Sequence, residues 1–216
     1  MDFDIHEKVQ SFFETYPKRT YPKDQIMIFG GESPEKVFYM ISGKISQYDI
    51  SYRGDEIVIN IYKSPAFFPM VWAMNKIPNR YFFKADEVSE VHMAPADDVV
   101  AFIKQNPDVM FNLVSRLYKG IDSLLERTVY LMSGSARSRI MYELVIEANR
   151  FGTKIAENCY EIHISESDLG SHVGLARETV SREVKRLKDK GLVEVVAGNI
   201  ILKDLASLKE QLGQVA

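Results

Sequence analysis

Apolar and polar residues alternate in short runs over the first part of the chain, beginning near residue 21. Tyr48, Ile50 and Tyr52 alternate with polar residues, and Ile57, Ile59 and Ile61 recur at the same spacing. This two-residue period predicts β-strands with one buried face, and the intervening Arg53-Gly54-Asp55 predicts a hairpin turn. The predicted strands cover residues 25–29, 36–41, 44–52, 56–62 and 81–84. Because these strands are short and closely spaced, they predict a sandwich or small barrel.

Helical patterns flank this β-rich region. Residues 1–20 predict a short helical segment that docks Phe12, Phe13 and Tyr16 onto a core. After Pro95 the period becomes helical again, and Asn106-Pro107-Asp108 is a good helix start because proline is tolerated in the first turn.

The helix that begins there carries a heptad pattern. One apolar line is Met110, Leu117, Leu124 and Leu131, and the other is Val114, Ile121 and Thr128. Such a seam, sustained over about three heptads, predicts pairing with a second copy of the same helix. The alternative is a long helix packed on its own domain. Gly134 interrupts the pattern, so we expect a β-domain over 1–105, a dimerisation helix over 106–134 and a further domain over 135–216.

The third region begins with an amphipathic helix over 137–151, ended by Phe151-Gly152, and a strand over 160–164. Ser165 and Asp168 then have the spacing of a capping box and predict a helix start. Gly174 stops this short helix, whose apolar residues are Leu169 and Val173. Val180, Val184 and Leu187 define a second helix. Two short helices joined by a glycine turn predict a helix-turn-helix, and residues 191–196 and 199–202, around Ala197-Gly198, predict a two-stranded wing.

The polar face of the second helix suits DNA reading. Its outward residues are Arg177, Glu178, Ser181, Arg182 and Lys185. Arginine can hold a guanine edge through two hydrogen bonds, and glutamate can accept from a cytosine amine. Residues 176–190 contain six Lys or Arg and three Asp or Glu, in a chain whose net charge is −3. The DNA-binding surface must therefore be local. The alternative is a small-molecule sensor whose C-terminal domain binds a protein partner through this face.

Composition excludes several other classes. Cys159 is the only cysteine, so one chain can form neither a disulfide framework nor a cysteine-rich metal site. The four histidines (6, 92, 163 and 172) are scattered, so we expect no metal, and no nucleophile–base pair indicates an enzyme. Met1-Asp2-Phe3-Asp4 does not begin a signal peptide. No run of about 18 apolar residues predicts a membrane span, so we expect a cytoplasmic protein.

The chain resembles the CRP/FNR family of bacterial transcription regulators over nearly its whole length. The most specific motif is Arg177-Glu178-Thr179-Val180-Ser181-Arg182, followed by Gly191-Leu192-Val193. Gly31, the segment 37–45 and Asn106-Pro107-Asp108 support it. The resemblance implies an α+β fold with a cyclic-nucleotide-binding-like β-roll (a jelly roll), a long dimerisation helix and a C-terminal winged helix-turn-helix.

The family's functional positions can be carried over residue by residue. Arg177, Glu178 and Arg182 match base-reading positions, while Ser165 and Thr179 match positions that commonly touch phosphates. The resemblance implies a palindromic double-stranded DNA site with TGTGA-like half-sites, about 34 Å apart by two-fold symmetry. It also makes RNA polymerase a candidate partner.

Three departures from the family pattern change these expectations. Ala176 replaces the usual Ser or Thr cap of the recognition helix, at a cost of about 1 kcal/mol. Phe68-Pro69 and Asn79-Arg80 replace the glycine, glutamate and Arg-Ser pair that bind a cyclic nucleotide. Leu124-Leu125 replaces the polar pair that meets the purine, which would leave purine atoms unsatisfied at about 1–3 kcal/mol. We therefore expect no tight cAMP binding.

An apolar and aromatic group near these positions has two interpretations. It is either a pocket for a hydrophobic or aromatic effector or a self-filled core without a ligand. The ligand-binding candidates are Phe67, Phe68, Met70, Trp72, Arg80, Phe82 and Leu124. Met74 and Tyr81 belong to the same apolar group, and Arg80 could hold an anion. We expect no cofactor, and nothing in the sequence supports haem.

Overall fold

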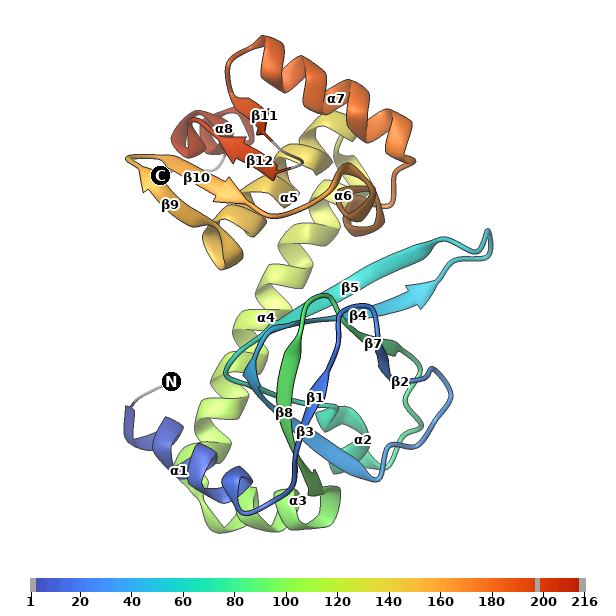
Figure 1. Ribbon diagram of the computed structural model, residues 1–216, viewed down its shortest axis with the longest axis vertical. Coiled ribbons are helices and arrows are strands. Elements are labelled where there is room, and N and C mark those ends of the chain that lie inside the picture. Colours follow the sequence, from blue (N-terminus) through green and yellow to red (C-terminus); the bar gives the residue numbers. More distant parts are fainter. Residues whose placement is uncertain (1–2, 197–198, 214–216) are drawn as a thin grey trace. The chain divides into compact units, whose positions relative to one another are not determined.

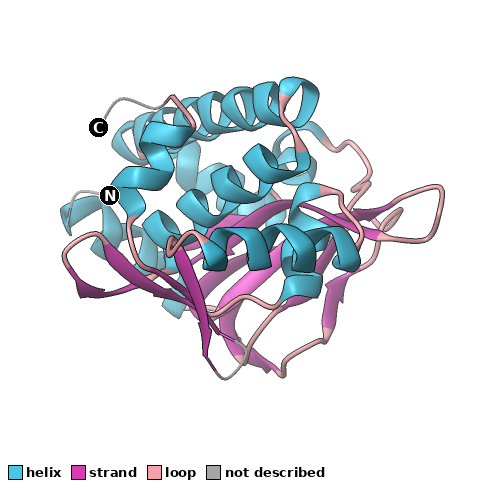
Figure 2. Cartoon of the chain, turned by 90° about the horizontal axis from the view of Figure 1, so that it is seen from above, coloured by secondary structure: helices cyan, strands magenta, loops and turns pink. Residues whose placement is uncertain are grey.

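The computed structural model describes residues 3–196 and 199–213. The chain divides into two compact units, Met1–Gly120 and Ile121–Ala216, and the division falls within the long helix α4 (Pro107–Ser133). Both units combine helices with strands, as the α+β prediction requires, and Figure 2 distinguishes the two kinds of element by colour. Among the described helices, none is both long enough and apolar enough to cross a membrane.

The N-terminal unit contains two antiparallel sheets (Figure 1), in which neighbouring strands other than β4 and β5 are not consecutive in sequence. One sheet has the order β1-β8-β3-β6 and the other β2-β7-β4-β5. The strands are β1 (Lys18–Tyr21), β2 (Ile26–Ile28), β3 (Lys36–Ser42), β4 (Lys44–Ile50), β5 (Glu56–Lys63), β6 (Ala66–Phe68), β7 (Phe82–Ala85) and β8 (Ser89–Pro95). The helices of this unit are α1 (Phe3–Glu14), α2 (Met70–Asn75), α3 (Ala96–Gln105) and the first half of α4.

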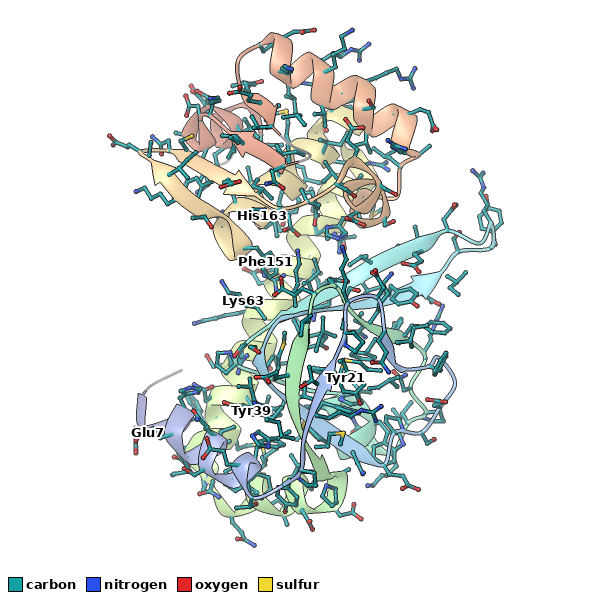
Figure 3. All side chains as sticks on the ribbon, viewed as in Figure 1. Glu7, Tyr21, Tyr39, Lys63, Phe151 and His163 are labelled. Carbon is teal, nitrogen blue, oxygen red and sulfur yellow. The ribbon has the colours of Figure 1, made fainter. Side chains whose placement is uncertain are left out.

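Strand β3 is buried on both faces, which explains its continuous apolar run. Phe38 and Met40 belong to the core shared by the two sheets, where Phe68 and Phe83 stack with centroids 5.1 Å apart. Val37 and Tyr39 belong to a second core beneath α1, α3 and the start of α4. Tyr39, labelled in Figure 3, stacks on Phe13 of α1 at 4.8 Å. The predicted docking of residues 1–20 through Phe12, Phe13 and Tyr16 is confirmed.

The predicted burial of the 48–52 alternation is confirmed for Tyr48 and wrong for Ile50 and Tyr52. Tyr48 is buried, but Ile50 is 50% and Tyr52 90% exposed. Strand β7 pairs with β4 only as far as Tyr48, so among the described residues no further strand lies beside β4 in the outer part of the β4–β5 hairpin. The hairpin turn itself is confirmed. In β5, Ile61 is buried as predicted, but Ile57 and Ile59 are half-buried and Val58 is buried instead, because a register shift between Gln47 and Tyr48 changes the facing residues.

The C-terminal unit contains the remainder of α4 and the elements predicted for a winged helix-turn-helix. Its helices are α5 (Ala136–Phe151), α6 (Glu166–Val173), α7 (Arg177–Asp189) and α8 (Leu205–Gln211). Its sheet has the order β11-β12-β10-β9, formed by β9 (Thr153–Ala156), β10 (Cys159–Ile162), β11 (Val193–Val196) and β12 (Asn199–Leu202). Ala197-Gly198, the predicted tip of the wing, lies outside the described residues. One core joins α5–α8 to this sheet.

Candidate nucleic-acid interface and sensor cavity

Helix α6 begins and ends as its sequence predicts. The Ser165 hydroxyl oxygen accepts from the Asp168 backbone N–H at 3.0 Å, closing the cap. Leu169 and Val173 are buried in the unit's core. Gly174 has φ of +66°, the left-handed conformation that glycine adopts without steric cost.

A second glycine brings the two helices of the motif close together. A Cβ built on Gly170 would lie 2.7 Å from the Leu175 carbonyl oxygen, a contact with backbone that a side chain could not relieve. The turn before α7 therefore packs directly on α6, and this packing fixes how α7 is presented. The sequence alone did not indicate this role of Gly170, because a glycine inside a predicted helix ordinarily indicates only a lower helix propensity.

Helix α7 buries its apolar stripe and presents its polar face. Val180, Val184 and Leu187 are each at most 2% exposed. On the opposite face, the side chains expected to read or approach DNA are exposed: Arg177, Glu178, Arg182 and Lys185. Thr179 and Ser181 are half-buried at the edge of this face, and Ser165 is exposed at the start of α6. All seven predicted DNA-contact residues therefore lie on the helix-turn-helix, with four of them on the exposed face of α7.

The start of α7 lacks a side-chain cap, as expected for Ala176. Its first turn is closed by backbone bonds alone, from the Thr179 and Val180 N–H groups to the Ala176 carbonyl at 2.9 and 3.1 Å. Arg182 and Arg186 of α7 differ in the partners that hold their side chains. Arg186 is paired with the nearly buried Glu183, whereas Arg182 donates to the Thr179 hydroxyl at 3.2 Å. Arg182 is therefore exposed but oriented.

The heptad residues of α4 form an exposed apolar stripe. Val114, Leu117, Ile121, Leu124 and Leu131 are between 36% and 59% exposed. Thr128 is exposed, and its hydroxyl donates to the Leu124 carbonyl at 2.7 Å. Met110 instead packs against the core of the N-terminal unit. A neighbouring line that sequence reasoning missed also repeats every seven residues and is still more exposed: Phe111, Tyr118, Leu125 and Met132, at 61–82%.

Some of the residues predicted to bind an effector belong to the protein core, and others line a cavity. Phe67 and Phe68 alternate along β6, so they enter the two different cores, and Phe82 stacks on Tyr48 at 5.2 Å. Met70, Trp72 and Arg80 instead line a cavity of about 190 Å³, together with Tyr62 and Tyr81 among others. Leu124 belongs to the C-terminal unit. Phe67 and Phe68 are thus core residues, whereas Phe82 is half-buried outside the cores, and a cavity exists beside them.

The polar side chains at this cavity already have partners. The Asn79 amide donates to the carbonyls of Phe29 and Tyr81 at 3.2 and 2.5 Å, which ties neighbouring loops together. The Arg80 guanidinium forms an ion pair with Asp49 at 3.1 Å. An anionic ligand would have to compete with that carboxylate for Arg80.

Comparison with known proteins matches both halves of the chain. A family model for the cyclic nucleotide-binding domain covers residues 18–106, and one for the Crp-like helix-turn-helix domain covers residues 138–211. The chain is 22% identical over 199 residues to the global nitrogen regulator of Nostoc sp., spanning 89% of this chain and 87% of that protein. It is 23% identical over 183 residues to the cAMP-activated global transcriptional regulator CRP of Salmonella typhimurium, spanning 84% and 87%.

Solved structures share the fold. A mutant of CooA from Carboxydothermus hydrogenoformans superposes with a TM-score of 0.80 at 22% identity, covering 98% of this chain and 97% of the other. The c-di-GMP-responsive global regulator CLP of Xanthomonas campestris also gives 0.80, at 17% identity and with 91% and 98% coverage. The two family models together cover most of the chain, which therefore belongs to the CRP/FNR family as a DNA-binding transcription regulator with a sensor domain.

Proposed function

We propose that the protein acts as a homodimer that reads a palindromic double-stranded DNA site with TGTGA-like half-sites. The observation that carries this proposal is the exposed face of α7, where Arg177, Glu178 and Arg182 stand opposite a fully buried apolar stripe. Arginine pairs with guanine and glutamate with cytosine in the major groove. Glu178 would repel phosphate, so a base edge is its favourable partner.

The apolar stripe on α4 supports the dimer. Leu117, Ile121 and Leu124 expose 59%, 42% and 47% of their surface, at positions where a two-stranded coiled coil buries its knobs. A second copy of the same helix offers the same spacing and covers both seam lines. Two copies would place two recognition helices on half-sites about one helical turn apart, roughly 34 Å.

We propose further that cAMP is not the effector. Phe68 is buried in the core where the family's nucleotide chemistry requires a glycine, and Arg80 is paired with Asp49. The cavity of about 190 Å³ is smaller than most small-molecule pockets, which occupy about 300–1,000 Å³. The sensor responds either to a small, largely apolar effector in this cavity or to none. No cofactor is proposed for the sensor domain; RNA polymerase is a candidate partner, and the cytoplasm is the expected location.

Fluorescence anisotropy tests the central proposal. The full chain is titrated into a labelled TGTGA-type palindrome and into a scrambled duplex of equal length and composition, at about 0.15 M salt. We expect much tighter binding to the palindrome. Contacts to the phosphates contribute binding free energy on both duplexes, and contacts to the bases add to it only on the palindrome. Equal affinity for the two duplexes would reject the palindrome, while leaving non-specific DNA binding intact. Calorimetry with cAMP is the companion measurement, and low-micromolar binding would reject the effector proposal.

A further inference from the structure

A buried cluster of three metal-ligand side chains lies between α5 and α6, away from the DNA-facing surface of α7. Glu143 and Glu147 stand one turn apart on α5, so their side chains share a face. His172 lies in the last turn of α6. The three residues are only 5%, 1% and 6% exposed, which is rare for carboxylates.

The spacing of the three side chains suits a metal ion. His172 Nδ1 lies 3.1 Å from Glu143 Oε1 and 3.5 Å from Glu147 Oε1. One ligand atom from each residue lies within 4.8 Å of the others. Zinc binds nitrogen and carboxylate oxygen at about 2.0–2.2 Å in tetrahedral geometry, which separates ligand atoms by about 3.3–3.6 Å. Small side-chain adjustments would therefore complete three coordination bonds.

Two arginines approach the buried carboxylates. Arg127 of α4 approaches Glu143 through the other carboxylate oxygen, with Nε 3.7 Å from Oε2, and its Nη2 donates to the His172 carbonyl. Arg150 acts on both Glu143 and Glu147. Buried charge is costly unless compensated, and the two guanidinium groups supply that compensation. Because Arg127 approaches Oε2, the Oε1 atom of Glu143 still faces His172.

We propose that Glu143, Glu147 and His172 bind a first-row divalent transition-metal ion, with Zn²⁺ the best match. One imidazole nitrogen and two carboxylates form a ligand set that suits zinc and disfavours Mg²⁺ and Ca²⁺, which take oxygen ligands. A proton on Nδ1 forms one good hydrogen bond, whereas an ion engages both carboxylates. Arg127 supports the site by orienting Glu143 from behind. The ion ties α5 to the first helix of the helix-turn-helix.

Metal content and affinity test the site directly, and the test is independent of any DNA sequence. The full chain, prepared without a histidine tag, is stripped with a chelator and titrated with Zn²⁺ by calorimetry, with Mg²⁺ as the matched control ion. We expect one Zn²⁺ per chain, a rise in melting temperature, and no response to Mg²⁺. Absence of Zn²⁺ binding at micromolar concentration overturns the proposal.

Two variants and a control locate the ion. Glu147→Gln and His172→Gln should each weaken Zn²⁺ binding by about 100-fold or more, because loss of even an outer-shell partner costs about 10–100-fold. His163→Gln is the control, since His163 is an exposed histidine of the same unit (Figure 3). Unchanged affinity in both cluster variants overturns the assignment.

If the variants do not fold, the wild-type chain loaded with Co²⁺ still decides the question. Nitrogen and oxygen ligands give visible bands without thiolate charge-transfer bands. Thiolate bands would place the ion at Cys159 and overturn the proposal.

Discussion

The Arg182 guanidinium donates a hydrogen bond to the Thr179 hydroxyl, 3.2 Å away and one turn earlier on α7. This bond orients a long, exposed side chain, and immobilising such a side chain on binding costs about 0.5–1.5 kcal/mol. Thr179→Val keeps the shape of the residue and removes the bond. We expect about 5-fold weaker binding to the palindromic site, measured by anisotropy.

The same variant separates two roles of Thr179. If the hydroxyl acts mainly on a phosphate, affinity for the palindrome and for scrambled DNA should fall together and the salt dependence should become shallower. If it orients Arg182, only the palindrome loses affinity. Unchanged binding to both duplexes would mean that the bond has no role in DNA reading.

Arg177 and Arg182 should behave as base readers. Replacing either by alanine is expected to cost about 1–3 kcal/mol on the matching site and to relax base preference there, because the duplex keeps its phosphate contacts. Arg19→Ala, which removes an exposed arginine on β1 in the other unit, is the matched control. A uniform loss across all sequences in either α7 variant would assign that arginine to phosphate instead.

The helix-turn-helix was predictable because its signals are local. Each signal involves residues within one or two helical turns of one another. The signals are the helix cap at Ser165, the helix end at Gly174 and the apolar stripe of valines and leucine on α7, and the structure contains all of them. The same apolar stripe also predicted which face of α7 is exposed, because the polar residues lie opposite it.

Features that depend on distant partners were not predictable. Strands β1, β6, β8 and β9 were missed, and Ser89–Pro95 shows why. This segment pairs with β1 and β3, neither of which is its neighbour in sequence. Adjacent phenylalanines on β6 looked like one patch but enter two cores. Similarly, Glu143 and Glu147 resemble a solvated helix face until α6 brings His172 against them, so scattered histidines suggested no metal site.

The missing cap of α7 offers a stabilising change. Ala176→Ser restores a side-chain oxygen for the N–H groups of the first turn, and we expect a gain of about 1 kcal/mol in the free energy of unfolding. Urea denaturation measures this, with Ser165→Ala as the opposite control, because that change removes an existing cap and should cost a similar amount. No gain from Ala176→Ser would mean that the Leu175–Arg177 turn cannot adopt the capping geometry.

The α4 stripe should control assembly. Leu117→Glu introduces a charge at the centre of the proposed seam and should shift the chain to monomer in analytical ultracentrifugation, because the charge would be buried beside its own copy. Lys119→Glu, on the opposite face of the same turn, is the control and should leave the assembly unchanged. Leu125→Glu probes the neighbouring exposed line. If only Leu125→Glu dissociates the assembly, the contact lies on that line and the Leu117 seam is wrong.

The Glu143 carboxyl should make the stability of the metal-free chain depend on pH. Burial alone would raise its pKa, but the hydrogen bond from His172 and the charge of Arg127 together hold that pKa below its usual range. A carboxyl with a lowered folded-state pKa stabilises the protein above the unfolded value, about 4.3 for glutamate. That stabilisation is lost as pH falls through the folded-state pKa. Glu143→Gln should therefore be less stable than the wild type at about pH 7, and the difference should narrow below about pH 4.3. Urea denaturation across this range, with chelator present, measures the difference. A gap that stays constant with pH would mean that the folded chain does not hold Glu143 as a stabilised carboxylate.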